Sequence, residues 1–341
     1  MHNIHGKMVY SLEQPMWHAI VEPSTEPLTA EQTLDNENFQ GGFTVNLAQS
    51  AYLTEDGKTI VNKKGFTILR SPTPYDPEVA IFGTCSDRYH PLQPREVVQR
   101  FDEMVNVPIE TMAFLGDGQE MFLSWKMPTI SVRPEDDIKM FSIIKGGFTT
   151  EHGWNLFTSI YRPVCANTVT FAQNWANQNT AGLVGNQWRG KGTNVNLLEH
   201  LGYWMEHLQL TAKKEVERIE LFFKALASVP TTDDEVKEIL LTAFAPKIVD
   251  LDRIPVQLRA KVTKETDELN QSMQKLRDGI FELFAGNGTA ITSDYWGILN
   301  ATSEYVCHFM PSKKPIAESV MFGNRAGYTA RIVKALQDRL G

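Results

Sequence analysis

The chain has 341 residues, of which 42% are hydrophobic and 22% are charged. This composition is typical of a globular protein, and it excludes a disordered chain, a collagen-like repeat and a long coiled coil. The 41 acidic residues outnumber the 33 basic residues and give a formal net charge of -8, which excludes a uniformly basic protein that coats nucleic acid.

The first third of the chain is predicted to form strands, because hydrophobic and polar residues alternate there. We expect these strands at residues 42–47, 64–70 and 76–83, with a turn at Glu55-Asp56-Gly57. A helix is predicted over residues 93–101, since Pro94 suits the first turn of a helix, where an amide proton has no helical partner.

A hairpin is predicted next, from two hydrophobic runs that a short segment with two glycines separates. The runs cover residues 111–115 and 120–125. Gly116 and Gly118 lie between them and can adopt the positive φ angles that a tight turn needs. The pattern predicts antiparallel pairing, because short turns join antiparallel strands.

The hydrophobic period changes from two to about 3.6 residues in the second half of the chain, which predicts helices. One stripe of the first of these helices consists of Leu197, Leu198, Leu201, Trp204, Met205 and Leu208. Asn196 and Thr232 are each followed three residues later by a glutamate, a pattern that is typical of helix starts. Helices are therefore expected to begin near both residues.

Two more helices complete the predicted fold. Ser293 is predicted to cap a helix over residues 294–310, and a final helix is expected over residues 326–340. The order of strands first and helices later predicts an α+β fold, with an antiparallel, hairpin-rich N-terminal part packed with helices and a mainly helical C-terminal part. We expect residues 1–200 to form the α+β core and residues 201–341 to form a helical part packed on it as one integrated unit.

The cysteine pattern indicates the compartment. Cys85, Cys165 and Cys307 are widely spaced and odd in number, which favours a reducing compartment over a disulfide framework. The sequence has neither an apolar signal region in residues 1–10 nor a run of about 18 apolar residues. We therefore expect a cytoplasmic protein without membrane contact.

The common catalytic signatures are absent from the sequence. It contains no phosphate-binding loop, no GxGxxG, no HExxH and no GxSxG, which are the usual motifs of nucleotide-binding proteins, metalloproteases and hydrolases. The three cysteines, with His90 and His308, do not have the spacing of a zinc site. The sequence therefore predicts no metal and no cofactor, and it favours a binding protein over an enzyme.

The net charge is distributed unevenly along the chain. Residues 1–138 have 10 basic and 20 acidic residues, residues 139–198 have five and one, and residues 199–341 have 18 and 20. The 47 residues from His152 to Leu198, here called the acid-free segment, contain no Asp or Glu. About five or six acidic residues would be expected there by chance. The depletion indicates a surface that can meet a polyanion.

The acid-free segment includes residue types that contact nucleic acid. Trp188, Arg189 and Lys191 follow one another closely, with glycines between and after them. Aromatic rings can stack on bases, and cationic groups can pair with phosphates. Arg162 earlier in the segment and Lys145 just before it complete the predicted phosphate and base contacts. The alternative is a polar loop in which Trp188 belongs to the core.

Asn167 and Thr168 are predicted to shape the same site. Both residue types can cap a helix that begins at Val169, and the free amides at the start of a helix can bind an anion. Arg162 would reinforce such a site. The structural alternative is the end of a strand, a buried Cys165 and an ordinary helix cap.

A polar stripe on the predicted helix of residues 294–310 offers a catalytic alternative. Asn300, Glu304 and His308 recur at four-residue steps, so they share one face of the helix. Glu304 and His308, together with His152, are the candidate general acid–base groups. The other interpretation is a solvated structural pair, because no nucleophile accompanies them.

Four short motifs carry a family resemblance. They are Tyr89–Pro94, Ile109–Gly118, Arg162–Thr168 and Trp296–His308. In this order they resemble the uncharacterised phage/plasmid-like protein family of prokaryotes, a domain of unknown function of the DUF932 type. The resemblance implies a bacterial, phage or plasmid setting, among genes of DNA replication and recombination.

Together with this resemblance, the sequence predicts a phage or mobile-element protein that binds nucleic acid, with single-stranded DNA as the favoured ligand, during recombination or replication. If a phage encodes it, the expected location is the cytoplasm of the bacterial host. One alternative is an enzyme that acts on a nucleotide or nucleic acid through Glu304 and His308. Another is a host-interaction factor that binds a host protein. A homo-oligomer is a further expectation.

Overall fold

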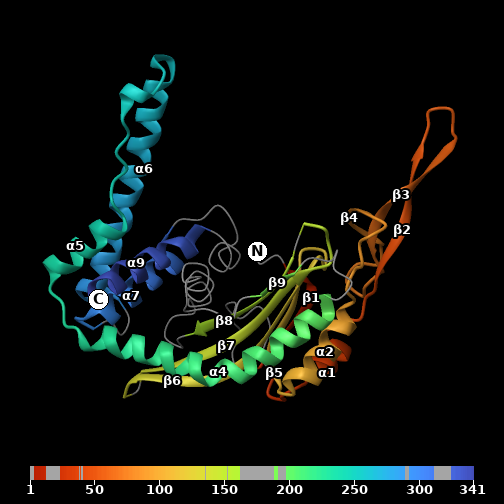
Figure 1. The fold of residues 1–341 in the computed structure, drawn as a ribbon, viewed down its shortest axis with the longest axis horizontal. Helices are drawn as coiled ribbons and strands as arrows, with labels where there is room; N and C mark the ends of the chain where they lie inside the picture. The colour runs from red at the N-terminus through yellow and green to blue at the C-terminus, as the bar shows by residue number, and fades with distance from the viewer. Residues whose placement is uncertain are drawn as a thin grey trace. The chain divides into compact units, whose positions relative to one another are not determined.

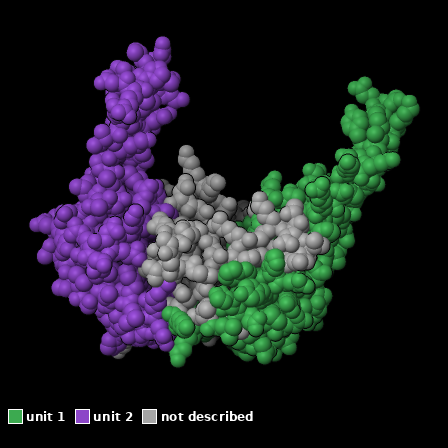
Figure 2. Space-filling model, in the orientation of Figure 1, with its two compact units in different colours: residues 1–128, 139–159, 176–215 green, residues 129–138, 160–175, 216–341 purple. Residues whose placement is uncertain are grey.

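The protein separates into two compact units in a computed structural model (Figure 2). Unit 1 has residues 1–128, 139–159 and 176–215, and unit 2 has residues 129–138, 160–175 and 216–341. The structure describes residues 4–12, 24–37, 39, 41–134, 136–151, 153–161, 188–190, 197–288, 292–310 and 324–341. The expectation that residues 1–200 and 201–341 pack as one integrated unit stays a prediction.

The larger sheet contains six of the described strands (Figure 1). In their order across the sheet they are β1 (Ile4–Ser11), β5 (Ile109–Leu115), β6 (Glu120–Arg133), β7 (Asp136–Gly147), β8 (Trp154–Tyr161) and β9 (Trp188–Gly190). β5 pairs antiparallel with β1 on one side and with β6 on the other. The predicted hairpin of residues 111–125 is therefore confirmed, and its glycines Gly116 and Gly118 have positive φ.

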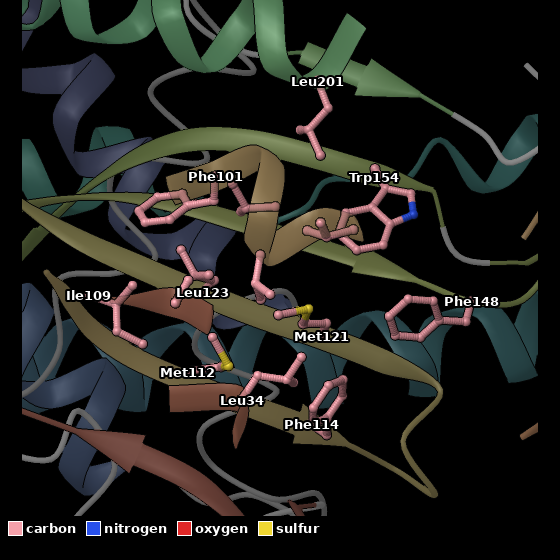
Figure 3. Packing of buried hydrophobic residues seen from close by; sticks show 14 of the residues in the cluster. Leu34, Phe101, Ile109, Met112, Phe114, Met121, Leu123, Phe148, Trp154 and Leu201 are labelled. Atoms are coloured by element: carbon pink, nitrogen blue, oxygen red, sulfur yellow. The ribbon is translucent and has the colours of Figure 1, made fainter. Parts of the chain in front are cut away.

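Three helices cover one face of this sheet and enclose the core of unit 1 (Figure 3). They are α1 (Ala30–Asp35), α2 (Pro94–Val105) and the first part of α4 (Leu197–Ser228). Leu34, Phe101 and Leu201 point from these helices toward Met112, Leu123 and other side chains of the sheet, and all are buried. Burial of apolar surface on this scale is the main stabilising contribution to unit 1.

A second, three-stranded antiparallel sheet belongs to unit 1. It consists of β2 (Val45–Leu53), β3 (Thr59–Arg70) and β4 (Ala80–Ser86), in that order. The Gln93 side chain joins it to the start of α2, because its amide donates to the Val45 carbonyl at 2.8 Å and accepts from the Val45 amide at 2.9 Å.

The predicted strand at residues 76–83 begins too early. Thr73 and Asp76 form a turn, with the Thr73 amide donating to the Asp76 carbonyl at 2.8 Å, and β4 begins at Ala80. The Asp76 carboxylate forms an ion pair with Arg70, whose side chain is fully buried. A buried guanidinium needs such a partner, so Asp76 is held in the turn instead of entering the strand.

Unit 2 is mainly helical. Beyond the second part of α4, its elements are α5 (Asp233–Ala243), η1 (Leu251–Arg253), α6 (Val256–Glu282), η2 (Leu283–Asn287), α7 (Tyr295–Glu304), η3 (Tyr305–Phe309) and α9 (Asn324–Leu340). The predicted helix start at Thr232 is confirmed, because its side chain accepts the Glu235 amide. The α+β class, with strands mainly in the N-terminal half and helices mainly in the C-terminal half, is confirmed as well.

The predicted cap at Ser293 is wrong by one residue. Asp294 is the N-cap of α7, and its carboxylate accepts the Gly297 amide and the Thr292 hydroxyl at 2.9 Å each. The same carboxylate forms an ion pair with Arg133. A carboxylate that satisfies an amide, a hydroxyl and a guanidinium at once is a better cap here than a serine hydroxyl.

α7 is the buried centre of unit 2. Its first five residues and most of its second turn are buried, and the ring of Trp296 lies 4.8 Å from that of Phe223, measured between centroids. The Trp296 indole nitrogen donates to the Asp136 carboxylate at 2.9 Å. Arg133 donates to the Ala227 carbonyl at 2.7 Å besides pairing with Asp294. The end of the β6–β7 hairpin is thereby fixed to α4 and α7 within unit 2.

We expect Gly146→Ala to destabilise unit 1. A Cβ at Gly146 would lie 2.1 Å from the ring of Trp154, which is fully buried, so the ring or the strand must shift, at a cost of about 1–3 kcal/mol. The measurement is the urea midpoint followed by circular dichroism. Gly42→Ala is the control, because a Cβ there meets no heavy atom of the described residues within 4 Å. Equal midpoints for both variants would contradict the packing.

We expect Glu235→Gln to flatten the acid dependence of stability in unit 2. A 2.7 Å hydrogen bond from the Tyr295 hydroxyl is the main reason why the pKa of Glu235 is lowered. The stability from its ionised form is therefore complete above the ordinary glutamate pKa of about 4.3 and is lost as the pH falls through the lower folded value. Glu235→Gln has no carboxylate to protonate at this position, so it should not lose this part of its stability in acid.

The measurement is the free energy of unfolding at neutral pH and at acidic pH. The control is Glu238→Gln on the same helix, because the Glu238 side chain pairs with Arg339 at 3.1 Å but is 67% exposed. The assignment fails if Glu235→Gln loses as much stability on acidification as the unsubstituted protein does.

Candidate nucleic-acid interface

β8 and β9 place two of the predicted contact residues at one end of the larger sheet (Figure 1). β9 pairs antiparallel with β8, so that Trp188 lies opposite Leu156 and Arg189 lies opposite Asn155. The two strands bring together residues that are more than 30 positions apart in the sequence. The acid-free segment thus supplies both β8 and β9 of the sheet.

The two faces of β8 have different surroundings. Trp154 and Leu156 are fully buried in the core of unit 1, where the Trp154 ring lies 5.6 Å from that of Phe148. Asn155 lies between them and therefore points to the other face of the strand. It is half-buried, and its amide donates to the Gly153 carbonyl at 3.2 Å. Arg189 occupies the register position beside this polar residue, whereas Trp188 occupies the position beside Leu156, one of the two core residues.

Lys145 is already engaged by an acidic residue. It lies on β7, and its ammonium is 2.9 Å from the Glu120 carboxylate of β6. The two side chains are only 15% and 19% exposed. Pairing in a partly buried position strengthens the attraction and reduces the positive field outside the pair. Lys145 therefore contributes less to a basic surface than the sequence indicates.

Several predicted site residues lie outside the described residues. They are His152, Arg162, Asn167, Thr168 and Lys191. Arg162 directly follows the last residue of β8, and Lys191 directly follows the last residue of β9. Their assignment as contacts stays a prediction.

The polar stripe of the catalytic alternative runs from the interior of unit 2 to its surface. The Asn300 side-chain nitrogen is buried and has no hydrogen-bond partner among the described residues. Glu304 at the end of α7 is partly exposed, and His308 in η3 is exposed. The Tyr305 ring beside them packs on Gly279 of α6, whose Cβ would lie only 2.0 Å from it. This region therefore packs η3 against α6.

The described residues offer no obvious metal site or membrane segment. None of their His, Cys, Asp and Glu side chains form a group of three or more that could hold a metal ion. Within the same residues, no helix is both long enough and apolar enough to cross a membrane.

Sequence reasoning missed the contacts that fix the β6–β7 hairpin. Arg133 and Asp294 are 161 positions apart, and Trp296 and Asp136 are 160 apart. No local pattern links such residues.

Sequence reasoning also missed the exposed apolar residues near the β2–β3 turn. The adjacent pairs Tyr52-Leu53 and Ile60-Val61 are a signal of apolar side chains on both faces of the hairpin, because neighbouring strand residues point to opposite faces.

Comparison with known proteins places the chain in a family without naming an activity. No curated protein and no solved structure matches it. A family described as a domain of unknown function (DUF932) matches residues 81–331. This range includes β8, β9 and α7 and covers more than half of the sequence. The chain therefore belongs to the DUF932 family.

Proposed function

We propose that the protein binds nucleic acid, with single-stranded DNA as its ligand, in recombination or replication. The observation that carries the proposal is the acid-free segment, 47 residues without a carboxylate in a chain with a net charge of -8. β8 and β9, which lie within this segment, pair with one another. The resemblance to phage/plasmid-like proteins supports the cellular setting.

The chemistry of this segment supports a polyanionic ligand. A phosphate chain is repelled by carboxylates and attracted by guanidinium and ammonium groups, and release of its counterions drives much of the binding. Arg189 and Lys191 supply two cations close together in the sequence, and Trp188 supplies a ring on which a base can stack. Unpaired bases are accessible for such stacking, which favours a single strand over a duplex.

The pairing of Lys145 with Glu120 shifts the proposed contacts toward β9. Breaking the 2.9 Å ion pair to reach a phosphate would leave Glu120 without this partner in a position that is 19% exposed. Loss of this pairing in a partly buried position is unfavourable. We therefore assign the main electrostatic contacts to Arg189 and Lys191, with Arg162 as the third cation.

We expect Arg189→Ala with Lys191→Ala to weaken DNA binding in a salt-dependent way. Loss of two phosphate contacts should reduce the slope of log Kd against log salt by about 1.4, since each single-strand contact contributes about 0.7. The measurement is fluorescence anisotropy with a labelled oligothymidine over a salt series. The control removes two exposed lysines of α6, Lys261→Ala with Lys264→Ala, and so matches the change in net charge.

Two outcomes would contradict the proposal. One is that the unsubstituted protein does not bind the oligonucleotide at low salt. The other is that both double variants have the same affinity and the same salt slope as the unsubstituted protein.

We expect Trp188→Ala to weaken binding at least about five-fold, because base stacking on an aromatic ring contributes about 1–3 kcal/mol per base. Trp188→Phe should retain most of the affinity, since it keeps a ring. The measurement is the same titration at one salt concentration, with circular dichroism to show that each variant is folded. Equal affinity of the alanine variant and the unsubstituted protein would exclude Trp188 as a stacking residue and would favour the alternative that it belongs to the core beside its strand partner Leu156.

A further inference from the structure

The β2–β3 pair extends beyond the three-stranded sheet as a two-stranded ribbon (Figure 1). β4 pairs with β3 only from Gly65 to Arg70. Residues 51–53 of β2 pair with residues 59–61 of β3, and no third strand is paired with them among the described residues. Within unit 1, this part of the hairpin points away from the larger sheet.

The base of the ribbon is a bulge that carries two lysines. The register shifts between the pair Gln49–Phe66 and the pair Ala51–Val61. On the β2 side, residues 62–65 of β3 are therefore opposite Ser50 alone. The Lys64 amide donates to the Asn62 side chain at 3.1 Å, which stabilises the bulge. Lys63 and Lys64 are both exposed at this point.

The ribbon exposes large apolar side chains on both faces. Tyr52 and Ile60 are opposite one another on one face and are 65% and 58% exposed. Leu53 and Val61 lie on the other face and are 68% and 49% exposed. A two-stranded ribbon alone is only marginally stable in water, and a cluster of exposed apolar side chains marks an interaction site. The ribbon therefore has the features of a surface that binds a partner.

The positive charge of the β2–β3 pair lies at the base of the ribbon. Residues 45–70 have four basic and two acidic residues, whereas residues 51–61, which form the ribbon and its turn, have one and two. Lys58 is 2.7 Å from Asp56, and the buried Arg70 is paired with Asp76. Lys63 and Lys64 have no ion pair with any described residue. Two exposed cations are thus available at the base of the ribbon, three and four residues along β3 from Ile60, the cross-strand partner of Tyr52.

We propose that the Tyr52 face of the ribbon is a second contact for single-stranded DNA, with the Tyr52 ring stacked on a base and Lys63 and Lys64 paired with phosphates. This inference rests on the proposed function and extends it to a surface outside the acid-free segment. An exposed ring beside free cations is the combination that sequence-tolerant single-strand binders use.

The charges favour DNA over a second copy of this chain. In a symmetric contact between two identical ribbons, the same surface patch of both copies meets. Residues 51–64 have three basic and two acidic residues, so each copy would bring a net positive charge to the contact, and like charges repel. A phosphate chain has the opposite charge and removes this repulsion.

The test compares Tyr52→Leu, Tyr52→Phe and Leu53→Ala in the full-length protein, with labelled oligothymidine as the probe. Tyr52→Leu keeps apolar bulk but removes the ring, and we expect it to weaken binding at least about five-fold. Tyr52→Phe should bind as the unsubstituted protein does. Leu53→Ala is the matched control, because Leu53 is the neighbouring residue with nearly equal exposure on the opposite face.

A second pair of variants tests the electrostatic part. Lys63→Ala with Lys64→Ala should lower the slope of log Kd against log salt by about 1.4. The Lys261→Ala and Lys264→Ala variant has the same net charge and should keep the original slope.

Two results would overturn the inference. In the first, Tyr52→Leu and the double lysine variant bind as the controls do. In the second, light scattering shows that Tyr52→Leu lowers the molecular mass in solution while DNA binding is unchanged, which would assign the ribbon to a second copy. If either occurs while Arg189 and Lys191 still matter, the proposed function stands without the ribbon. If the unsubstituted protein binds no DNA, both proposals fail.

Discussion

The position of the Trp154 ring over the bare backbone of Gly146 determines the edge of the larger sheet. Because Gly146 has no side chain, the ring can lie directly against β7 and pack on Phe148 at 5.6 Å. This contact fixes β8, and β9 is positioned through its pairing with β8. The candidate interface therefore depends on a contact in the hydrophobic core of unit 1. A strand that is held by one large aromatic residue gives a rigid frame on which polar residues can be displayed.

Local sequence patterns predicted the elements whose signals are local. Pro94 opens α2, Thr232 caps α5, and the hairpin of residues 111–125 turns at two glycines, because each feature depends on residues a few positions apart. The errors come from long-range partners. Asp76 is held by Arg70 and delays β4, and Asp294 replaces Ser293 as a cap while it also pairs with Arg133. For the candidate interface, counting charges found the acid-free segment, but the engagement of Lys145 by Glu120 is visible only in the folded sheet.

The family motif at residues 296–308 has a structural explanation. Trp296 contacts Phe223 and Asp136, and a Cβ at Gly297 would lie 1.7 Å from the Thr292 carbonyl oxygen. A larger residue than glycine does not fit there without moving the backbone. The residues that make the motif recognisable are thus largely those that pack the centre of unit 2. A family can be identified from such a motif although it says little about a ligand, because packing restricts sequence as strongly as binding does.

The division of the chain between the two units limits how the gene can be rearranged and the order in which the units can fold during synthesis. Residues 129–138 belong to unit 2, although the sequence on both sides of them belongs to unit 1. No single cleavage of the chain separates the two units intact. During synthesis, residues 129–138 of unit 2 are made before unit 1 is complete at residue 215. A gene fusion or truncation at a single boundary therefore cannot remove or exchange one whole unit. The two units must be transmitted together, and each can complete its own packing only after most of the sequence has been synthesised.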